Sequence, residues 1–183
     1  NTMAKAKIAI LGFGREGRSL LEYLRSSPRY ADAEFWVLDK NEAVASELPN
    51  DPRVHDMCGP RYLTNLTRFH TLFRSPGISY TLPQLVAAKR KGVRISSATK
   101  LFFDEIQNVE PRPPMLIGIT GSKGKGTTAT LLHDILVRSG FRALLAGNIG
   151  KPMLEVLPEA GEAECIVLEL SSFQLQDLHV SPH

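Results

Sequence analysis

The chain has 183 residues, of which 43% are hydrophobic and 22% charged, and its formal net charge is +3. This length allows one domain or two small ones with a buried core. So mild a charge does not indicate a nucleic-acid partner, and no apolar run approaches the length of a membrane span. There is no signal-peptide pattern, and Cys58 and Cys165 form no metal or redox spacing. We therefore expect a cytoplasmic protein without nucleic-acid or membrane partners.

Predicted strands and helices alternate along the first half of the chain. Short apolar runs predict strands at 7–12, 35–39, 70–75 and 93–96. A helix is predicted at 17–26. Thr81 is expected to cap a second helix, which has Pro83 in its first turn and Gly92 just past its end.

Three prolines within 109–114 ("VEPRPP") break this periodicity and form the best linker candidate. Beyond them, a helix is expected from Thr127 to a C-cap at Gly140. The predicted strands of this half are 115–119, 142–147 and 165–170. Alternating strands and helices predict parallel sheets in an α/β fold. We place the boundary between two α/β units at 109/110, which gives domains 1–109 and 110–183.

The stretch "GITGSKGKGTT" (118–128) places glycines and lysines between a predicted strand and a predicted helix. Such a turn directs backbone N–H groups and a helix N-terminus at one point, which suits a phosphate. Lys125 would add a positive charge, and Thr127 or Thr128 a hydroxyl for a metal ion. The match to G-x-x-x-x-G-K-[ST] is imperfect, because Gly126 follows the lysine. The alternative is a glycine-rich connection without a ligand, which leaves two lysines in a tight turn unexplained.

Two polar residues accompany the predicted strands of the second half. Glu169 lies near the carboxyl end of the apolar run "CIVLEL", where an unpaired buried carboxylate would cost several kcal/mol. Mg²⁺ at that edge of the sheet is the natural partner, and the alternative is a glutamate on an edge strand that faces water. Asn148, in "GNIG" (147–150), either hydrogen-bonds a substrate or simply forms the turn.

Two glycine turns follow predicted strands in the first half. "GFGREG" (12–17) fits G-x-G-x-x-G between a strand and a helix, and Asp39 ends the next strand, which favours a dinucleotide such as NAD. The geometry guarantees only a helix start that accepts an anion, and Asp39 can bind any ribose or polar ring. "RSPGI" (74–78) supplies a second turn, so the pair could hold a diphosphate other than that of NAD. Taken alone, "SPGI" is also compatible with an ordinary turn.

Three motifs in this order and at this spacing, "GITGSKGKGTT", "AGNIG" and "LELSSFQL", resemble the Mur ligase family, and within it the MurD type. The resemblance covers essentially the whole chain. It implies a Rossmann-like parallel-sheet domain that holds UDP rather than NAD, followed by an incomplete P-loop α/β ATPase domain. The family's loop, roughly G-[ST]-[NK]-G-K-x-[ST], fits 121–127. Gly126 at the variable place is more typical of folylpolyglutamate synthases, a sister family, and moves the expected hydroxyl contact to Thr127.

The resemblance implies roles for individual residues. It makes Lys125 and Glu169 catalytic, and it makes Thr127 and Glu169 ligands of Mg²⁺. The expected ATP-binding residues are Gly121, Ser122, Lys123, Gly124, Lys125, Gly126, Thr127 and Thr128. The expected contacts of the UDP-muramoyl substrate are Gly14, Arg15, Glu16, Asp39, Lys40, Ser75, Pro76, Gly77, Asn148, Ser171 and Gln174. For the last two, helix capping is the alternative.

The implied reaction is ATP-dependent amide-bond formation in peptidoglycan precursor synthesis. ATP phosphorylates the carboxylate of UDP-N-acetylmuramoyl-L-alanine to an acyl phosphate, and the amine of D-glutamate then displaces phosphate. The acyl phosphate supplies the leaving group that a carboxylate lacks. Lys125 and the N–H groups of the loop would balance the charge that develops on the transferred phosphoryl group. The expected cofactors are ATP and Mg²⁺.

Members of the family continue, after the last motif, with a metal-binding histidine, a modified lysine and a third domain. The chain stops at His183, which lies in no such motif. We therefore expect a fragment that is inactive alone, from a protein that is monomeric at full length. Two alternatives stay open. One is another Mur ligase or a folylpolyglutamate synthase-like ligase. The other is a non-catalytic nucleotide-binding module or an NAD-binding Rossmann protein.

Overall fold

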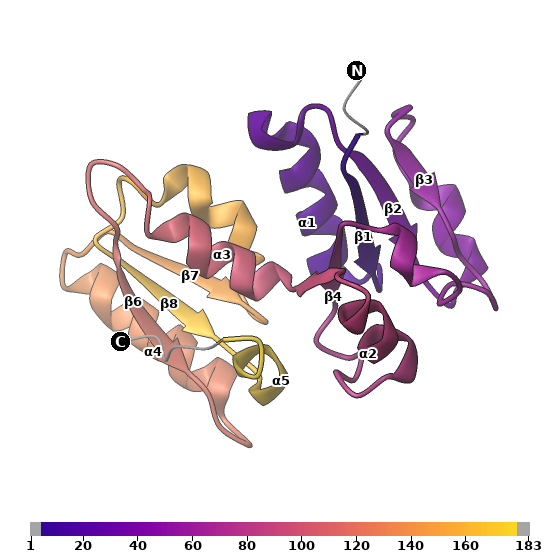
Figure 1. Ribbon diagram of the computed structural model, residues 1–183. Coiled ribbons are helices and arrows are strands. Elements are labelled where there is room, and N and C mark those ends of the chain that lie inside the picture. Colours follow the sequence, from indigo (N-terminus) through magenta and orange to yellow (C-terminus); the bar gives the residue numbers. More distant parts are fainter. Residues whose placement is uncertain (1–4, 179–183) are drawn as a thin grey trace. The chain divides into compact units, whose positions relative to one another are not determined.

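The structure is a computed structural model that describes residues 5–178 (Figure 1). The chain forms two compact units, the first ending at Ala98 and the second beginning at Thr99. The boundary predicted at 109/110 lies further along, because helix α3 (Ala98–Ile106) joins the second unit and buries Phe102 and Ile106. His183 lies outside the described residues. Within 5–178, no helix has both the length and the apolar character needed to span a membrane.

The first unit contains a five-stranded parallel sheet with the order β3-β2-β1-β4-β5. Its strands are β1 (Lys7–Leu11), β2 (Glu34–Leu38), β3 (Val54–Asp56), β4 (Thr71–Arg74) and β5 (Arg94–Ser96). The connections contain α1 (Arg15–Ser26), α2 (Pro83–Arg90), η1 (Pro28–Tyr30), η2 (Glu42–Glu47) and η3 (Leu66–Arg68), the last three being 3₁₀ segments. The predicted α/β class is confirmed. β3 was not predicted, because its three residues are half-buried or exposed and form no apolar run.

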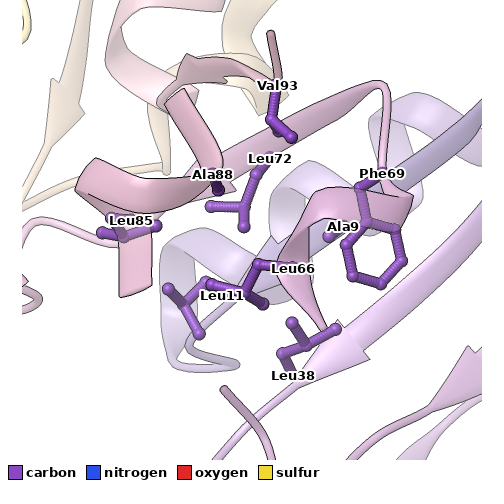
Figure 2. Packing of buried hydrophobic residues seen from close by; sticks show 9 residues of the cluster. All are labelled: Ala9, Leu11, Leu38, Leu66, Phe69, Leu72, Leu85, Ala88 and Val93. Carbon is purple, nitrogen blue, oxygen red and sulfur yellow. The ribbon is translucent and has the colours of Figure 1, made fainter. Parts of the chain in front are cut away.

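Helices cover both faces of this sheet because β1 carries apolar side chains on both. On one face, residues mainly of β1, η3 and α2 form a buried cluster (Figure 2). Its members are Ala9, Leu11, Leu38, Leu66, Phe69, Leu72, Leu85, Ala88 and Val93. Side chains alternate along a strand, so Ile10 points to the other face, where α1 buries Leu20, Leu21 and Leu24. The result is a doubly wound sheet.

The predicted start of α2 is wrong in one detail. The residue that precedes the helix is Leu82 rather than Thr81, and no side chain caps it. The hydroxyl of Thr81 instead pairs with that of Ser79 at 2.8 Å. Pro83 opens the helix, where its missing N–H has no helical acceptor, and Gly92 follows the helix with φ +92°. These two positions agree with the prediction.

The second unit contains three parallel strands in the order β6-β8-β7. Its elements after α3 are β6 (Met115–Ile119), α4 (Lys125–Arg138), β7 (Ala143–Gly147), the 3₁₀ segment η4 (Met153–Glu159), β8 (Cys165–Glu169) and α5 (Ser172–Leu175). All five residues of β8 are buried, because it is the central strand. The register aligns Glu169 with Ile119 of β6 and with Gly147 of β7. The loops that follow β6 and β7 therefore begin beside Glu169.

A charged cluster joins loops at the amino ends of β2 and β3 in the first unit. Arg25 donates to the carboxylate of Asp51 at 3.0 Å, and Arg53 donates to it at 3.2 Å and 3.0 Å. Arg53 also donates to the carbonyl oxygen of Ala31 at 3.2 Å, so that the cluster links α1, η1 and β3. The hydrogen bonds from Arg53 are the main cause that holds the pKa of Asp51 well below its ordinary value of 3.8.

We expect Asp51→Asn to lower the free energy of unfolding by about 2 kcal/mol at pH 7, a typical contribution of hydrogen bonds to a charged group. A carboxyl whose pKa is lowered by folding stabilises the protein above its unfolded pKa and loses that contribution as the pH falls toward its folded pKa. The difference between the two proteins should therefore be constant from pH 7 to pH 5 and shrink below about pH 4. Urea unfolding at pH 7, 5 and 3 measures it. An equal difference at all three pH values would contradict this role of Asp51.

Candidate functional site

A pocket of about 490 Å³ opens at the carboxyl ends of β1, β2 and β4 in the first unit. β1 lies between β2 and β4, so the pocket occupies the point where the strand order reverses, the usual place of ligands in such sheets. Five of the predicted substrate contacts line it: Gly14, Asp39, Lys40, Ser75 and Gly77. The structure thus brings together residues from three separate loops of the sequence.

The loop after β1 needs glycine at defined places. Gly12 has φ +91°, and a Cβ there would lie 2.6 Å from Oγ of Ser75, which donates to its carbonyl oxygen at 3.0 Å. A Cβ on Gly17 would overlap the carbonyl oxygen of Gly12, so this glycine permits the close packing of α1 on the strand end. Gly14 precedes α1 without a capping side chain and faces open space. The N-terminus of α1 is therefore accessible to an anion.

The half-buried Asp39 stabilises this loop through hydrogen bonds. Its Oδ2 accepts a hydrogen bond from the backbone N–H of Phe13 at 2.8 Å, and its Oδ1 accepts one from the N–H of Asn41 at 2.9 Å. Both carboxylate oxygens thus fix the loops that follow β1 and β2. A carboxylate has further lone pairs for a ligand, but its first role in this structure is to shape the pocket.

The remaining predicted contacts of the first unit lie beside the lining of the pocket. Arg15 and Glu16 occupy the first turn of α1, and Pro76 lies within the loop after β4. Six lining residues are absent from the predicted contacts: Gly12, Phe13, Tyr62, Ile78, Ser79 and Leu82. Gly12, Phe13 and Ile78 lie within the predicted glycine turns, and Ser79 and Leu82 follow the second of these turns. Tyr62 carried no signal, because it belongs to the irregular segment between β3 and η3.

The loop between β6 and α4 contains the glycines and lysines predicted to bind phosphate. Gly121 and Gly124 have φ values of +150° and +75°, a region that favours glycine. Lys125 begins α4, and its Nζ donates to the carbonyl oxygen of Gly121 at 2.8 Å. No side chain caps α4, so its first N–H groups are available to an anion at the loop. Ser122 and Lys123 are exposed on the same loop.

The first turn of α4 contains the candidate hydroxyl ligands. Thr127 and Thr128 are both exposed. A Cβ on Gly126 would lie 3.5 Å from a methyl carbon of Ile149, an ordinary contact, so packing does not require glycine there. The departure from the common phosphate-loop pattern at this position is therefore not imposed by the fold.

Glu169 ends the central strand of the second sheet beside the start of the glycine loop. The residue is only 5% exposed, and within 5–178 its carboxylate has no hydrogen bond or ion pair. The alternative of an edge-strand glutamate that faces water is wrong, because β8 is central and buried. A carboxylate without a protein partner on a residue so little exposed fits a cation. The described residues contain no group of three or more histidine, cysteine or acidic side chains placed to hold a metal ion, so Mg²⁺ would also need hydroxyl, phosphate or water oxygens.

Ser171 and Gln174 form a capping box at the start of α5. The hydroxyl oxygen of Ser171 accepts from the N–H of Gln174 at 3.2 Å, and Oε1 of Gln174 accepts from the N–H of Ser171 at 2.7 Å. Oε1 of the fully buried Gln174 also accepts from Nδ2 of Asn148 at 3.1 Å. The capping alternative for this pair is thus what the structure shows, and Gln174 additionally fixes the side chain of Asn148.

The turn that contains Asn148 should be sensitive to a single added methyl group at Gly147. We expect Gly147→Ala to lower the free energy of unfolding by about 3 kcal/mol, because φ is +112° and a Cβ would overlap the carbonyl oxygen of Glu169. Gly140→Ala is the matched control, since φ is +91° but nothing lies within 4 Å, and it should cost about 1 kcal/mol. Urea unfolding followed by circular dichroism measures both. Equal losses would show that the overlap is relieved by a backbone shift.

The first unit matches a known family. Residues 6–97 match the profile of the MurD-like N-terminal domain of Mur ligases. This match covers half of the chain and includes every strand of the first sheet and the whole pocket. The chain therefore belongs to the MurD-like Mur ligases, as its motifs predicted.

Curated relatives extend the similarity over both units. A UDP-N-acetylmuramoylalanine–D-glutamate ligase from Acetivibrio thermocellus is 36% identical over 181 residues, which are 97% of this chain and 37% of that protein. The protein of the same name from Clostridium kluyveri is 33% identical over 177 residues, with shares of 96% and 37%. The solved structure of UDP-N-acetylmuramate:L-alanyl-gamma-D-glutamyl-meso-diaminopimelate ligase from Neisseria meningitides matches 91% of this chain and 52% of its own, with 16% identity and a TM-score of 0.47. The chain spans 37% of the length of these two curated relatives.

Proposed function

We propose that the chain supplies the UDP-substrate-binding unit and the ATP-binding loop of a cytoplasmic ligase, monomeric at full length, that joins D-glutamate to UDP-N-acetylmuramoyl-L-alanine. The observation that carries the proposal is Glu169, a buried carboxylate without a protein partner, beside the glycine loop that presents Lys125. The names of the relatives support the choice of substrates. The product is an amide bond in a precursor of peptidoglycan.

In the first unit, backbone groups are best placed to bind the nucleotide part of the substrate. The uncapped N-terminus of α1 and the loop after β4 both border the pocket, and both suit a diphosphate. Asp39 fixes the loop beside them and has lone pairs left for a uridine group. Lys40 adds a positive charge at the rim. These features support UDP as the ligand.

In the second unit, charged side chains suit phosphoryl transfer from ATP to the substrate carboxylate. The ammonium of Lys125 uses one donor on Gly121 and keeps two for phosphate oxygens. With the N–H groups of the loop, it would stabilise the negative charge that grows on the transferred group. Thr127 and Glu169 would hold Mg²⁺, which when bound would neutralise and orient phosphate oxygens. Gln174 keeps Asn148 in place for contact with substrate.

The first unit should bind UDP rather than NAD. We expect millimolar UDP to raise the melting temperature of the chain and NAD to leave it unchanged, because a ligand of the folded state stabilises by RT ln(1 + [L]/Kd). Gly14→Asp should abolish the shift with UDP, since the new carboxylate lies where we place the diphosphate. It should leave the fold intact, because a side chain there meets nothing within 4 Å and aspartate caps helices well.

Gln84→Glu is the control for this test, because it adds the same charge at an exposed position in the first turn of α2, outside the pocket lining. It should retain the full shift with UDP. A shift with NAD but none with UDP would overturn the proposal for the first unit.

Lys125→Ala should remove catalysis while leaving the fold intact. In a protein extended to the length of the relatives, we expect ADP formation dependent on UDP-muramoyl-alanine and D-glutamate to fall at least about 100-fold, the typical loss of one transition-state donor. The melting temperature should hardly change, because Lys125 is only half-buried and its Nζ donates to the carbonyl oxygen of an exposed loop residue. Arg138→Ala, at the other end of α4, removes the same charge and should keep full turnover. Near-normal turnover of the Lys125 variant would show that the loop is not the ATP site.

A further inference from the structure

Arg74 is the last residue of β4 and is buried, with only 3% of its surface exposed. Its Nη1 donates to three backbone carbonyl oxygens of the loop that follows: Ser75 at 3.1 Å, Pro76 at 3.3 Å, and Ile78. Its guanidinium carbon also lies 4.0 Å from the ring centroid of Tyr80. The carbonyl groups of this loop therefore point toward the buried guanidinium group of Arg74.

This arrangement decides where the N–H groups of the loop point. In a trans peptide, the C=O of one residue and the N–H of the next point in opposite directions. Because the carbonyl groups of Pro76 and Ile78 point toward Arg74, the N–H groups of Gly77 and Ser79 point away from it. Neither N–H has a hydrogen-bond partner within the described part of the chain, and both residues line the pocket.

The same loop is fastened to the glycine turn after β1. The N–H of Ser75 donates to the carbonyl oxygen of Leu11 at 2.9 Å, and its hydroxyl donates to that of Gly12 at 3.0 Å. The two backbone donors of the loop and the uncapped start of α1 thus border one pocket. Backbone N–H groups without protein partners that border one pocket suit an anion.

We propose that Arg74 is a positioning residue that sets the affinity of this pocket for the diphosphate of a uridine nucleotide. Arg74 is buried behind the loop and acts through the N–H groups of Gly77 and Ser79 rather than by contact with the ligand. The inference rests on the proposed function of the first unit. It adds the side chain that orients the diphosphate-binding N–H groups. The effect of the geometry of Arg74 can be separated from the effect of its charge.

The test compares UDP with uridine, which lacks the phosphates, by NMR titration of the ¹⁵N-labelled chain. Arg74→Lys keeps the positive charge, but a lysine cannot present the planar fork of an arginine to several carbonyl groups. Arg74→Met removes both charge and donors. We expect both variants to bind UDP roughly tenfold more weakly or worse, as for the loss of one hydrogen bond to a charged group, and to bind uridine within about twofold of the unchanged chain.

Arg53→Met is the matched control. Arg53 also donates from its guanidinium to backbone carbonyl groups, those of Arg25 and Ala31, but at the amino ends of the strands, away from the pocket. It should lower the melting temperature without changing the ratio of UDP affinity to uridine affinity. If Arg74 were merely structural, its variants would also leave the ratio of UDP affinity to uridine affinity unchanged. An unchanged ratio in Arg74→Lys would therefore overturn the inference.

The unchanged chain gives a second readout that does not depend on the folding of any variant. The amide signals of Gly77 and Ser79 should shift with UDP and stay in place with uridine. Shifts with both ligands or with neither, while UDP binds, would overturn the inference and leave the proposed function standing. Absence of UDP binding by the unchanged chain would overturn the proposed function and this inference together.

Discussion

Each sheet of the chain depends on a close approach of two strand ends that only a glycine permits. In the first unit, Gly12 follows β1, has a positive φ and lies close to the hydroxyl of Ser75. This hydroxyl donates to the carbonyl oxygen of Gly12. In the second unit, Gly147 leaves β7 directly against the backbone of Glu169. Parallel strands end at one edge of a sheet, so these contacts bring neighbouring loops together there. The loops after β1 and β4 and the turn that contains Asn148 are held in this way.

Buried and half-buried polar side chains then determine the shape of these loops. Asp39 accepts two backbone N–H groups, Arg74 donates to three carbonyl groups, and Gln174 accepts from a backbone N–H and from Asn148. Leaving such backbone groups buried without partners would cost about 1–3 kcal/mol each. The side chains that satisfy them therefore stabilise one loop conformation. In the first unit, this conformation leaves the N–H groups of Gly77 and Ser79 for a ligand.

The two candidate sites differ in what they offer to phosphate. The first presents mainly backbone N–H groups and a helix N-terminus, which bind a fixed negative charge. The second adds an ammonium, Lys125, and a carboxylate, Glu169, which has no protein partner within 5–178. Such a pair can respond to charge that moves during a reaction, and a divalent cation would satisfy the carboxylate. This difference fits a binding unit followed by a catalytic one.

The sequence by itself determined the α/β class, the strands of both sheets except β3, and the glycine turns. These features follow from local periodicity and from glycine at turns. Only the tertiary structure decided the order of the strands, the place of α3, the position of Tyr62 in the pocket, and the partners of Asp39 and Ser75. The physical reason is distance along the chain. Asp39 accepts a hydrogen bond from Phe13, 26 positions away, and the hydroxyl of Ser75 donates to Gly12, 63 positions away. Such contacts exist only once the strands are ordered.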